Sequence, residues 1–150
     1  MNQKLIFAFL LLAMLSMVNA IPHQLLKRAP FVPCPTPKGS THPVSFLQVS
    51  ISPDPPVAGQ SDIVVVSGTF SEDVTPKTNL AVVFTDLSQQ PIAPPTVVSA
   101  CTKTGCPKAG TKYNQTVTVK APESLPATYI MAIGVGNSLT DVLGCAYAIL

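Results

Sequence analysis

Short runs that alternate apolar and polar residues recur along the chain after its first twenty residues. These runs are rich in Val, Ile, Thr, Phe and Tyr, and clusters of Pro and Gly separate them. Alternation with a period of two indicates strands, and no helical period of useful length competes with it. The pattern predicts seven strands, which cover Ser45–Ile51, Asp62–Phe70, Leu80–Thr85, a segment ending near Val98, Lys112–Lys120, Ala127–Val135 and Asp141–Ile149.

Seven short strands separated by turn residues favour an all-β fold, a two-sheet sandwich of the immunoglobulin type. The chain has no Trp, so it lacks the Cys–Trp–Cys core of antibody domains. Its 16 Pro residues exclude a helical bundle, and its charged fraction of 11% argues against a disordered tail or a coiled coil. A length of 150 residues suits one domain.

Two strand patterns bear on what the sheets cover. Ile63–Val66 is apolar on both sides of its strand, which indicates burial on both faces or a sheet beside a second apolar space. The last two strands carry small residues at alternating positions, namely Ala132, Gly134, Gly144, Ala146 and Ala148. This pattern has two interpretations: a flat outer face or close sheet packing, or an apolar cavity between the sheets that holds an apolar ligand.

Residues 1–20 have the features of a secretory signal peptide. Lys4 supplies the positive start, Leu5–Leu15 is an apolar run, and Val18–Ala20 is a small-residue cleavage site. The run is too short for a membrane span, which needs about 20 residues. Lys27–Arg28 is a dibasic pair, so residues 21–28 are either a pro-segment ending at a cleavage site or an ordinary charged linker. The mature domain is expected at 29–150.

Charge excludes several kinds of partner. Removing residues 1–28 leaves six Lys against seven Asp and Glu, no Arg, and a net charge of −1. Nucleic-acid and phosphate sites depend on Lys and Arg clusters, above all on the guanidinium fork. We therefore expect no nucleic-acid partner and no tight binding to anionic membranes through bulk charge.

All four cysteines follow the signal peptide, and an even count in a secreted chain predicts disulfides. Cys101 and Cys106 flank a short loop with Gly105, which suits a local bridge and leaves Cys34 for Cys145. A zinc site is not expected, because His42 is the one histidine after residue 28 and there is no second close cysteine pair.

Asn114–Thr116 is an N-glycosylation sequon. In the predicted strand, Asn114 shares a polar face with Thr116, Thr118 and Lys120, where a glycan is tolerated.

Catalytic constellations are missing from the sequence. His42 stands alone before Pro43 and is interpreted as a solvated loop residue without a nucleophile to serve. Glu72 and Asp73 are neighbours in a connection and are interpreted as a solvated turn, not as the carboxylate pair of a glycosidase. No glycine-rich phosphate loop occurs. The chain is therefore predicted not to be an enzyme.

Several motifs together resemble one family. They are Ser52–Gln60 (SPDPPVAGQ), Val66–Val74 (VSGTFSEDV), Cys101-x4-Cys106-Pro107, Gly110-x2-Tyr113 and the ending Gly144–Ile149 (GCAYAI). In order, spacing and cysteine placement they resemble fungal phosphatidylglycerol/phosphatidylinositol transfer proteins, which belong to the ML lipid-recognition domain family. That family also includes the Niemann-Pick type C sterol carriers and the group 2 mite allergens. The resemblance covers about Phe31 to Leu150.

The resemblance implies an immunoglobulin-like sandwich that encloses a lipid cavity, with the same Cys34–Cys145 and Cys101–Cys106 bridges. The cavity mouth is implied near Pro91–Pro95, with no cofactor. Implied cavity residues lie on inward strand faces: Val49, Ile51, Val64, Val66, Val82, Phe84, Ile92, Val117, Val119, Tyr129, Met131 and Ile133. On the last strands, the small-residue set beginning at Ala146 is the competing choice of face.

The function implied is a carrier, secreted or in the lumen of the secretory or vacuolar pathway. It takes the acyl chains of a phospholipid, another fatty acyl lipid or a sterol, touches membranes transiently, and is expected to be a monomer. The alternative is a secreted interaction module or effector that binds a receptor or host surface without lipid cargo.

Departures from the family pattern bear on which lipid the chain is expected to bind. Sterol carriers usually have a third disulfide after the first strand, but Ser52–Pro56 has no cysteine. Small residues such as Ala93 and Ala146 stand where sterol pockets have aromatic ones, which leaves room for acyl chains. A headgroup could meet a point charge near the short disulfide loop, at Lys103, Lys108 or Lys112, although solvated surface lysine is the alternative.

Overall fold

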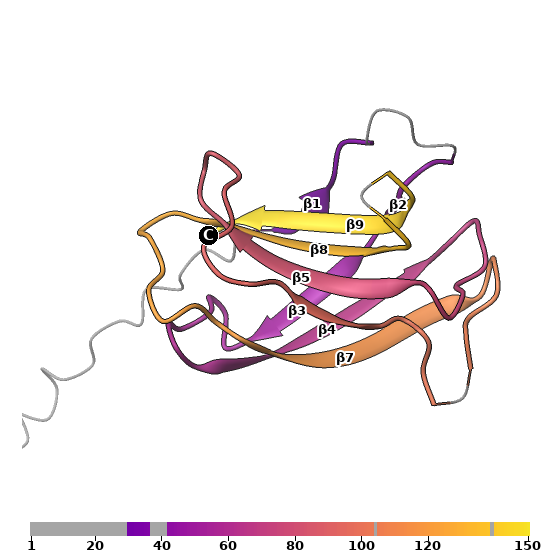
Figure 1. The fold of residues 1–150 in the computed structure, drawn as a ribbon, viewed down its shortest axis with the longest axis horizontal. Helices are drawn as coiled ribbons and strands as arrows, with labels where there is room; N and C mark the ends of the chain where they lie inside the picture. The colour runs from indigo at the N-terminus through magenta and orange to yellow at the C-terminus, as the bar shows by residue number, and fades with distance from the viewer. Residues whose placement is uncertain (1–29, 37–41, 104, 139) are drawn as a thin grey trace, which may run out of the picture.

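A computed structural model describes residues 30–36, 42–103, 105–138 and 140–150 of the chain. The predicted signal peptide 1–20 and the candidate pro-segment 21–28 lie outside the described residues. Within the described residues, no helix is long and apolar enough to span a membrane. Two β-sheets face each other, as Figure 1 shows, so the prediction of an all-β two-sheet sandwich is confirmed.

The first sheet has six strands in the order β1-β9-β8-β5-β6, with β2 paired to β9. Its strands are β1 (Val32–Pro33), β2 (Ser45–Phe46), β5 (Asn79–Thr85), β6 (Thr96–Ser99), β8 (Ile130–Gly136) and β9 (Val142–Ile149). The second sheet has three strands in the order β3-β4-β7. These are β3 (Gln48–Ser52), β4 (Ser61–Thr69) and β7 (Lys112–Lys120).

The first predicted strand, Ser45–Ile51, divides between the two sheets. Its start is β2, which runs parallel to β9, and its remainder is β3, which runs antiparallel to β4. Leu47 lies at the crossing, completely buried, and its N–H donates to the carbonyl of Cys145. A strand pattern alone does not reveal such a crossing, because both pieces keep the same alternation.

The inner faces of the two sheets form one apolar core. Buried and exposed residues alternate along β4 and β7, and buried residues alternate with partly exposed ones along β5 and β8, so one side of each strand faces the other sheet. The expectation that Ile63–Val66 is buried on both faces is wrong, because Ile63 is 51% exposed. Ile63 pairs with Ser52 and Thr118 on the outer face of the three-stranded sheet, and that face remains open to solvent.

Both disulfides join the pairs of cysteines predicted from the sequence. Cys34 bridges to Cys145, 111 residues away, and so ties the first described segment to the last strand. Cys101 bridges to Cys106 across the short loop between β6 and β7. In the chain-entropy model, a bridge that closes about 100 residues stabilises the folded state by about 4–5 kcal/mol.

Candidate functional site

The twelve residues implied as cavity residues all lie in the core or against it. Ten are buried, while Val49 and Ile92 are partly buried and pack against the core. They come from both sheets: Val49 and Ile51 on β3, Val64 and Val66 on β4, Val117 and Val119 on β7, Val82 and Phe84 on β5, Met131 and Ile133 on β8, with Tyr129 before β8 and Ile92 after β5. Their role in binding a ligand remains a proposal.

The small residues of the last strands are divided between two faces of the sheet. Gly144, Ala146 and Ala148 are buried on β9. In the strand register, Ala146 is opposite Ile133 and Ala148 is opposite Met131. The two competing sets for the cavity wall are therefore neighbours on one inner face, where large residues of β8 lie beside small residues of β9.

Ala132 and Gly134 instead lie on the outer face of the first sheet. There they border an open apolar groove of about 400 Å³ together with Ala81, Val83, Val142 and Cys145. Of the twelve implied cavity residues, Ile133 also borders this groove. Two further hollows lie outside the sandwich, one beside the short disulfide loop and one beside β2 and β4. Part of the small-residue pattern thus reflects an outer groove and not the interior.

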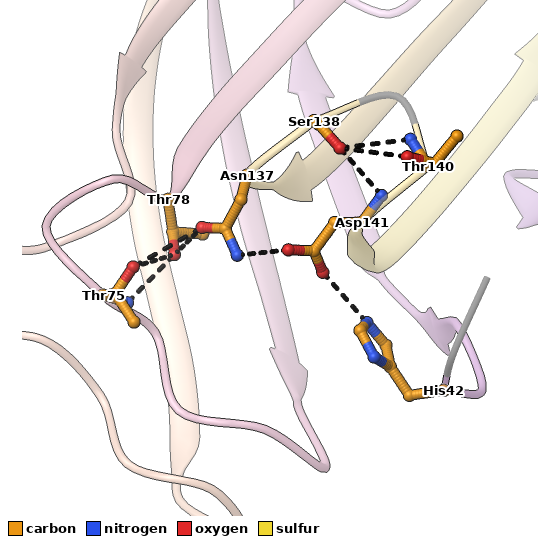
Figure 2. A network of polar contacts seen from close by, with 7 residues as sticks. All are labelled: His42, Thr75, Thr78, Asn137, Ser138, Thr140 and Asp141. Carbon is orange, nitrogen blue, oxygen red and sulfur yellow. Dashed lines mark hydrogen bonds and ion pairs between the residues drawn. The ribbon is translucent and has the colours of Figure 1, made fainter. Parts of the chain in front are cut away.

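A polar network fastens one end of the sandwich (Figure 2). We call it the network end, and its described connections are 70–78, 100–103, 105–111, 137–138 and 140–141. The Thr78 hydroxyl, completely buried, donates to Asn137 Oδ1 over 2.7 Å and accepts from the N–H of Thr75. Asn137 Nδ2 donates to Asp141 Oδ2 over 2.7 Å. His42 Nε2 lies 3.3 Å from Asp141 Oδ1.

His42 was expected to be solvated, and that expectation is wrong. Only 15% of its side chain is exposed, because the imidazole packs against the loop that leads into β9. Its contact with Asp141 holds the N-terminal segment to the network end. The sequence alone does not indicate this contact, because the two residues are 99 positions apart. Among the described residues, no group of three His, Cys, Asp or Glu side chains gathers as a metal site.

The lysines near the short disulfide loop lie at the network end as well. Lys108 Nζ donates to Asp73 Oδ2 over 2.8 Å, and the N–H of Ala109 donates to Asp73 Oδ1. These hydrogen bonds and the lysine charge hold the pKa of Asp73 below its usual value. Lys112 is exposed at the start of β7. Asp73 therefore anchors a connection through Lys108, in addition to lying in a solvated turn.

The opposite end, which we call the proline-rich end, carries connections 53–60, 86–95 and 121–129 and the C-terminus (Figure 1). Its described backbone hydrogen bonds run within single sheets. Gly59 N–H donates to the carbonyl of Pro122 beside β4 and β7, and Tyr129 exchanges two bonds with Leu150 beside β8 and β9. Ile92 N–H donates to the carbonyl of Phe84.

Within the part of the chain that the structure describes, two polar side chains are buried at the proline-rich end without a hydrogen-bond partner. They are Asp62, at the start of β4, and Tyr129, whose ring centroid lies 6.1 Å from that of Phe84. Burial raises the pKa of the Asp62 carboxyl. Burial, and then the charges of Asp62 and Asp54, raise the pKa of Tyr129 to about 12. At neutral pH the Tyr129 hydroxyl is therefore protonated and able to donate.

Sequence reasoning included Tyr129 but missed Asp62. The usable signal was its place in the alternation, since Asp62, Val64 and Val66 occupy every second position of one strand. A charged residue on an inward strand position is rare, because burying an unpaired charge is costly.

Comparison with known proteins identifies the family. Residues 28–148 match the family model of the ML domain, and the chain therefore belongs to the ML domain family. A search of curated proteins finds no match.

An insect protein and an avian protein are among the solved structures that are similar to this chain. A Niemann-Pick type C2 protein from the Japanese carpenter ant is 18% identical, with coverage of 79% of this chain and 96% of that chain and a TM-score of 0.53. Chicken MD-1, solved in complex with lipid IVa, is 12% identical, with coverage of 69% and 79% and a TM-score of 0.48. The likeness to the ant protein supports the fold described above.

Proposed function

We propose that this chain is a secreted lipid carrier that takes the acyl chains of a phospholipid, or a sterol, between its two sheets. The observation that carries the proposal is the convergence of twelve apolar side chains from both sheets on one interior, in a member of the ML domain family. The lipid named with chicken MD-1 agrees with this class of ligand. Resemblance to the fungal phospholipid transfer proteins supports the phospholipid as cargo.

Binding of this kind needs no covalent step. Moving an acyl chain from water into an apolar interior contributes about 0.8 kcal/mol per buried methylene. The side chains of the interior are aliphatic for the most part, so they match acyl chains in polarity. Apolar contacts are not directional, so they do not fix one orientation of the acyl chain. The chain's residues therefore bind and release the lipid without catalysing a reaction.

The proline-rich end is the better candidate for lipid entry. The network end is held by the Thr78–Asn137–Asp141 hydrogen bonds and by Gln115 of β7, whose Nε2 donates to the carbonyl of Ser99 in the other sheet over 3.0 Å. Separating the sheets there breaks the Gln115 bond, because it joins β7 to the other sheet. The described backbone hydrogen bonds at the proline-rich end run within single sheets, so they survive when the sheets move apart there.

Exposed apolar residues at the proline-rich end support a transient membrane contact. Leu87 is 60% exposed in connection 86–95, and Val57 is 43% exposed in connection 53–60. The two connections belong to different sheets, so a bilayer that meets both residues lies across the space between the sheets.

Lipid binding is tested on the mature protein purified from the medium of an expressing cell. The protein is incubated with vesicles of phosphatidylcholine, phosphatidylglycerol and ergosterol, re-isolated, and examined by native mass spectrometry. We expect a one-to-one complex with a lipid. A protein that arrives without lipid and takes none from the vesicles would disprove the carrier function and favour the interaction module.

Transfer is tested with a fluorescent phospholipid moving from donor to acceptor vesicles. We expect Leu87→Ser with Val57→Ser to slow transfer several-fold while the bound lipid stays the same. Val97→Ser is the matched control, because Val97 is 54% exposed on edge strand β6 and not in these connections. An equal loss in the control and the double variant would contradict entry at the proline-rich end.

A further inference from the structure

Two unpartnered polar groups face the interior from opposite sheets at the proline-rich end. The Asp62 side chain is completely buried, and neither carboxylate oxygen has a hydrogen-bond partner in the described part of the chain. Tyr129 is 5% exposed, and its hydroxyl also has none there. Thr78, which is the other completely buried polar residue among those described, is hydrogen-bonded within the polar network.

Strand geometry directs both side chains inward. Asp62 is two residues before buried Val64 on β4 and pairs with buried Val119 on β7, so it shares their inner face. Tyr129 is two residues before buried Met131, at the start of β8 in the other sheet. Both residues thus face the interior at the same end of the sandwich, and the charge of Asp62 contributes, after burial, to the raised pKa of Tyr129.

The unpartnered state of these groups is costly to the fold. A buried polar group without a partner costs about 1–3 kcal/mol, and a charged one costs more. An apolar residue at position 62 would continue the pattern of Val64 and Val66 at no such cost. Asp62 and Tyr129 do not bond to each other in the described part of the chain, so both remain available to a ligand group that can donate and accept.

We infer that Asp62 and Tyr129 bind an uncharged hydroxyl group of the lipid cargo, which donates to the Asp62 carboxylate and accepts from the Tyr129 hydroxyl. This inference rests on the proposed carrier function and narrows its ligand to a sterol or another lipid alcohol in preference to a phospholipid. The apolar part of the lipid lies along the core, and its hydroxyl stops at the proline-rich end. The hydroxyl belongs either to a fused-ring alcohol or to a long-chain alcohol, since both present the same chemistry.

Other headgroups satisfy only half of this site. An ammonium group donates to Asp62 but has no lone pair to accept from Tyr129. A carboxylate or phosphate accepts from Tyr129 but is repelled by Asp62, and Asp54 adds negative charge nearby. A hydroxyl is both donor and acceptor, so it alone of these groups pairs with both residues.

The test compares each alcohol with its methyl ether, which still accepts from Tyr129 but has no hydrogen to donate to Asp62. The pairs are cholesterol with its methyl ether and oleyl alcohol with its methyl ether, and affinities are measured by displacement of a bound uncharged apolar fluorescent dye. We expect the wild-type protein to bind at least one alcohol about tenfold more tightly than its ether, the effect of one lost hydrogen bond to a charged group. The pair that shows the difference identifies the source of the hydroxyl.

Variants separate the two contacts. Asp62→Val removes the acceptor, so the alcohol-to-ether ratio falls to about one. Tyr129→Phe removes the donor, so affinities for alcohol and ether fall together and their ratio is retained. Thr118→Val, on the exposed face of β7, is the control and leaves all affinities unchanged. Should Asp62→Val fail to fold, Asp62→Asn is used, and the preference for oleyl alcohol over oleate falls instead.

The outcomes distinguish this inference from the function on which it rests. A wild-type protein that binds none of the four probes and no vesicle lipid overturns the carrier function itself. Equal affinity for alcohol and ether in wild type and variants overturns the hydroxyl site alone. In that case lipid binding stands, and a water molecule satisfies Asp62 and Tyr129.

Discussion

Leu47 occupies the space that a side chain at position 144 would need. A Cβ built on Gly144 would stand 2.9 Å from Leu47 Cδ2, and 2.6 Å from Cε1 of Phe70. Both side chains are buried, so neither has solvent to move into. The crossing of the chain at Leu47, from one sheet to the other, therefore depends on the missing side chain of a residue on β9.

Gly144→Ala is expected to lower the free energy of unfolding by about 1–3 kcal/mol, the usual cost of overpacking a core. Gly134→Ala is the matched control, because its nearest atom would be the carbonyl oxygen of Gly144 at 4.0 Å. We expect the control to change stability by less than about 0.5 kcal/mol. Urea denaturation followed by circular dichroism measures both. Similar losses of stability in the two variants would show that the side chains of Leu47 and Phe70 move aside at little cost.

Thr78→Val is expected to destabilise the protein by about 1–3 kcal/mol, because it keeps the shape of the side chain but leaves Asn137 Oδ1 without its 2.7 Å donor. Thr118→Val, on the exposed face of β7 and outside the Asn114–Thr116 sequon, is the control and should have little effect. Thermal denaturation compares the two. If the network does not stabilise the fold, both variants will show the same small change in thermal stability.

Asp62→Asn is expected to stabilise the protein at neutral pH by about 1 kcal/mol or more. Burial raises the Asp62 pKa above its ordinary 3.8, so between the two values the folded state binds more protons than the unfolded state. The free energy of unfolding then falls as the pH rises through this window, and the cost of Asp62 is complete above the raised pKa.

The measurement is therefore urea denaturation of wild type and Asp62→Asn at pH 7 and at about pH 3.5, below the ordinary carboxyl pKa. The advantage of the variant should be present at pH 7 and should nearly vanish at the lower pH. Glu72→Gln, which removes a charge from an exposed connection, is the control for net charge. An equal advantage at both pH values would mean that the charge of Asp62 is not the cause.

Asn114 is predicted to carry an N-linked glycan. Its side chain is exposed on β7, on the outer face shared with Thr116 and Thr118, so a glycan projects into solvent there. Enzymatic deglycosylation of the protein secreted from a eukaryotic host should lower its mass, and Asn114→Gln should abolish the difference. An unchanged mass in the wild type would refute the prediction.

Much of the core could be predicted because burial follows a local rule. Val64, Val66, Met131 and Ile133 lie inside since every second residue of a strand faces the same way. Ile63 shows the limit of this rule. Its strand identity was predicted, but its exposure depends on whether another layer covers the outer face, and none does in the described residues.

The candidate site was predictable only in part. Tyr129 follows from the alternation that continues into β8, whereas Asp62 stands at the start of a strand, where a polar residue normally meets solvent. Its burial is decided by the pairing of β4 with β7 and the packing of the two sheets, which no local pattern encodes. His42 was misjudged for the same reason, because its contact with Asp141 is made by a segment distant in sequence.

The sequence by itself determined most of the strands, although not β1, as well as the cysteine pairs and the apolar character of the interior, because these depend on alternation, loop length and composition. Only the tertiary structure decided which faces meet. It divided Ser45–Ile51 between two sheets, put Ala146 inside and Ala132 outside, and brought Asp62 and Tyr129 to the same end. The physical reason is that strand pairing and sheet packing join residues far apart in the chain, and no local pattern encodes their partners.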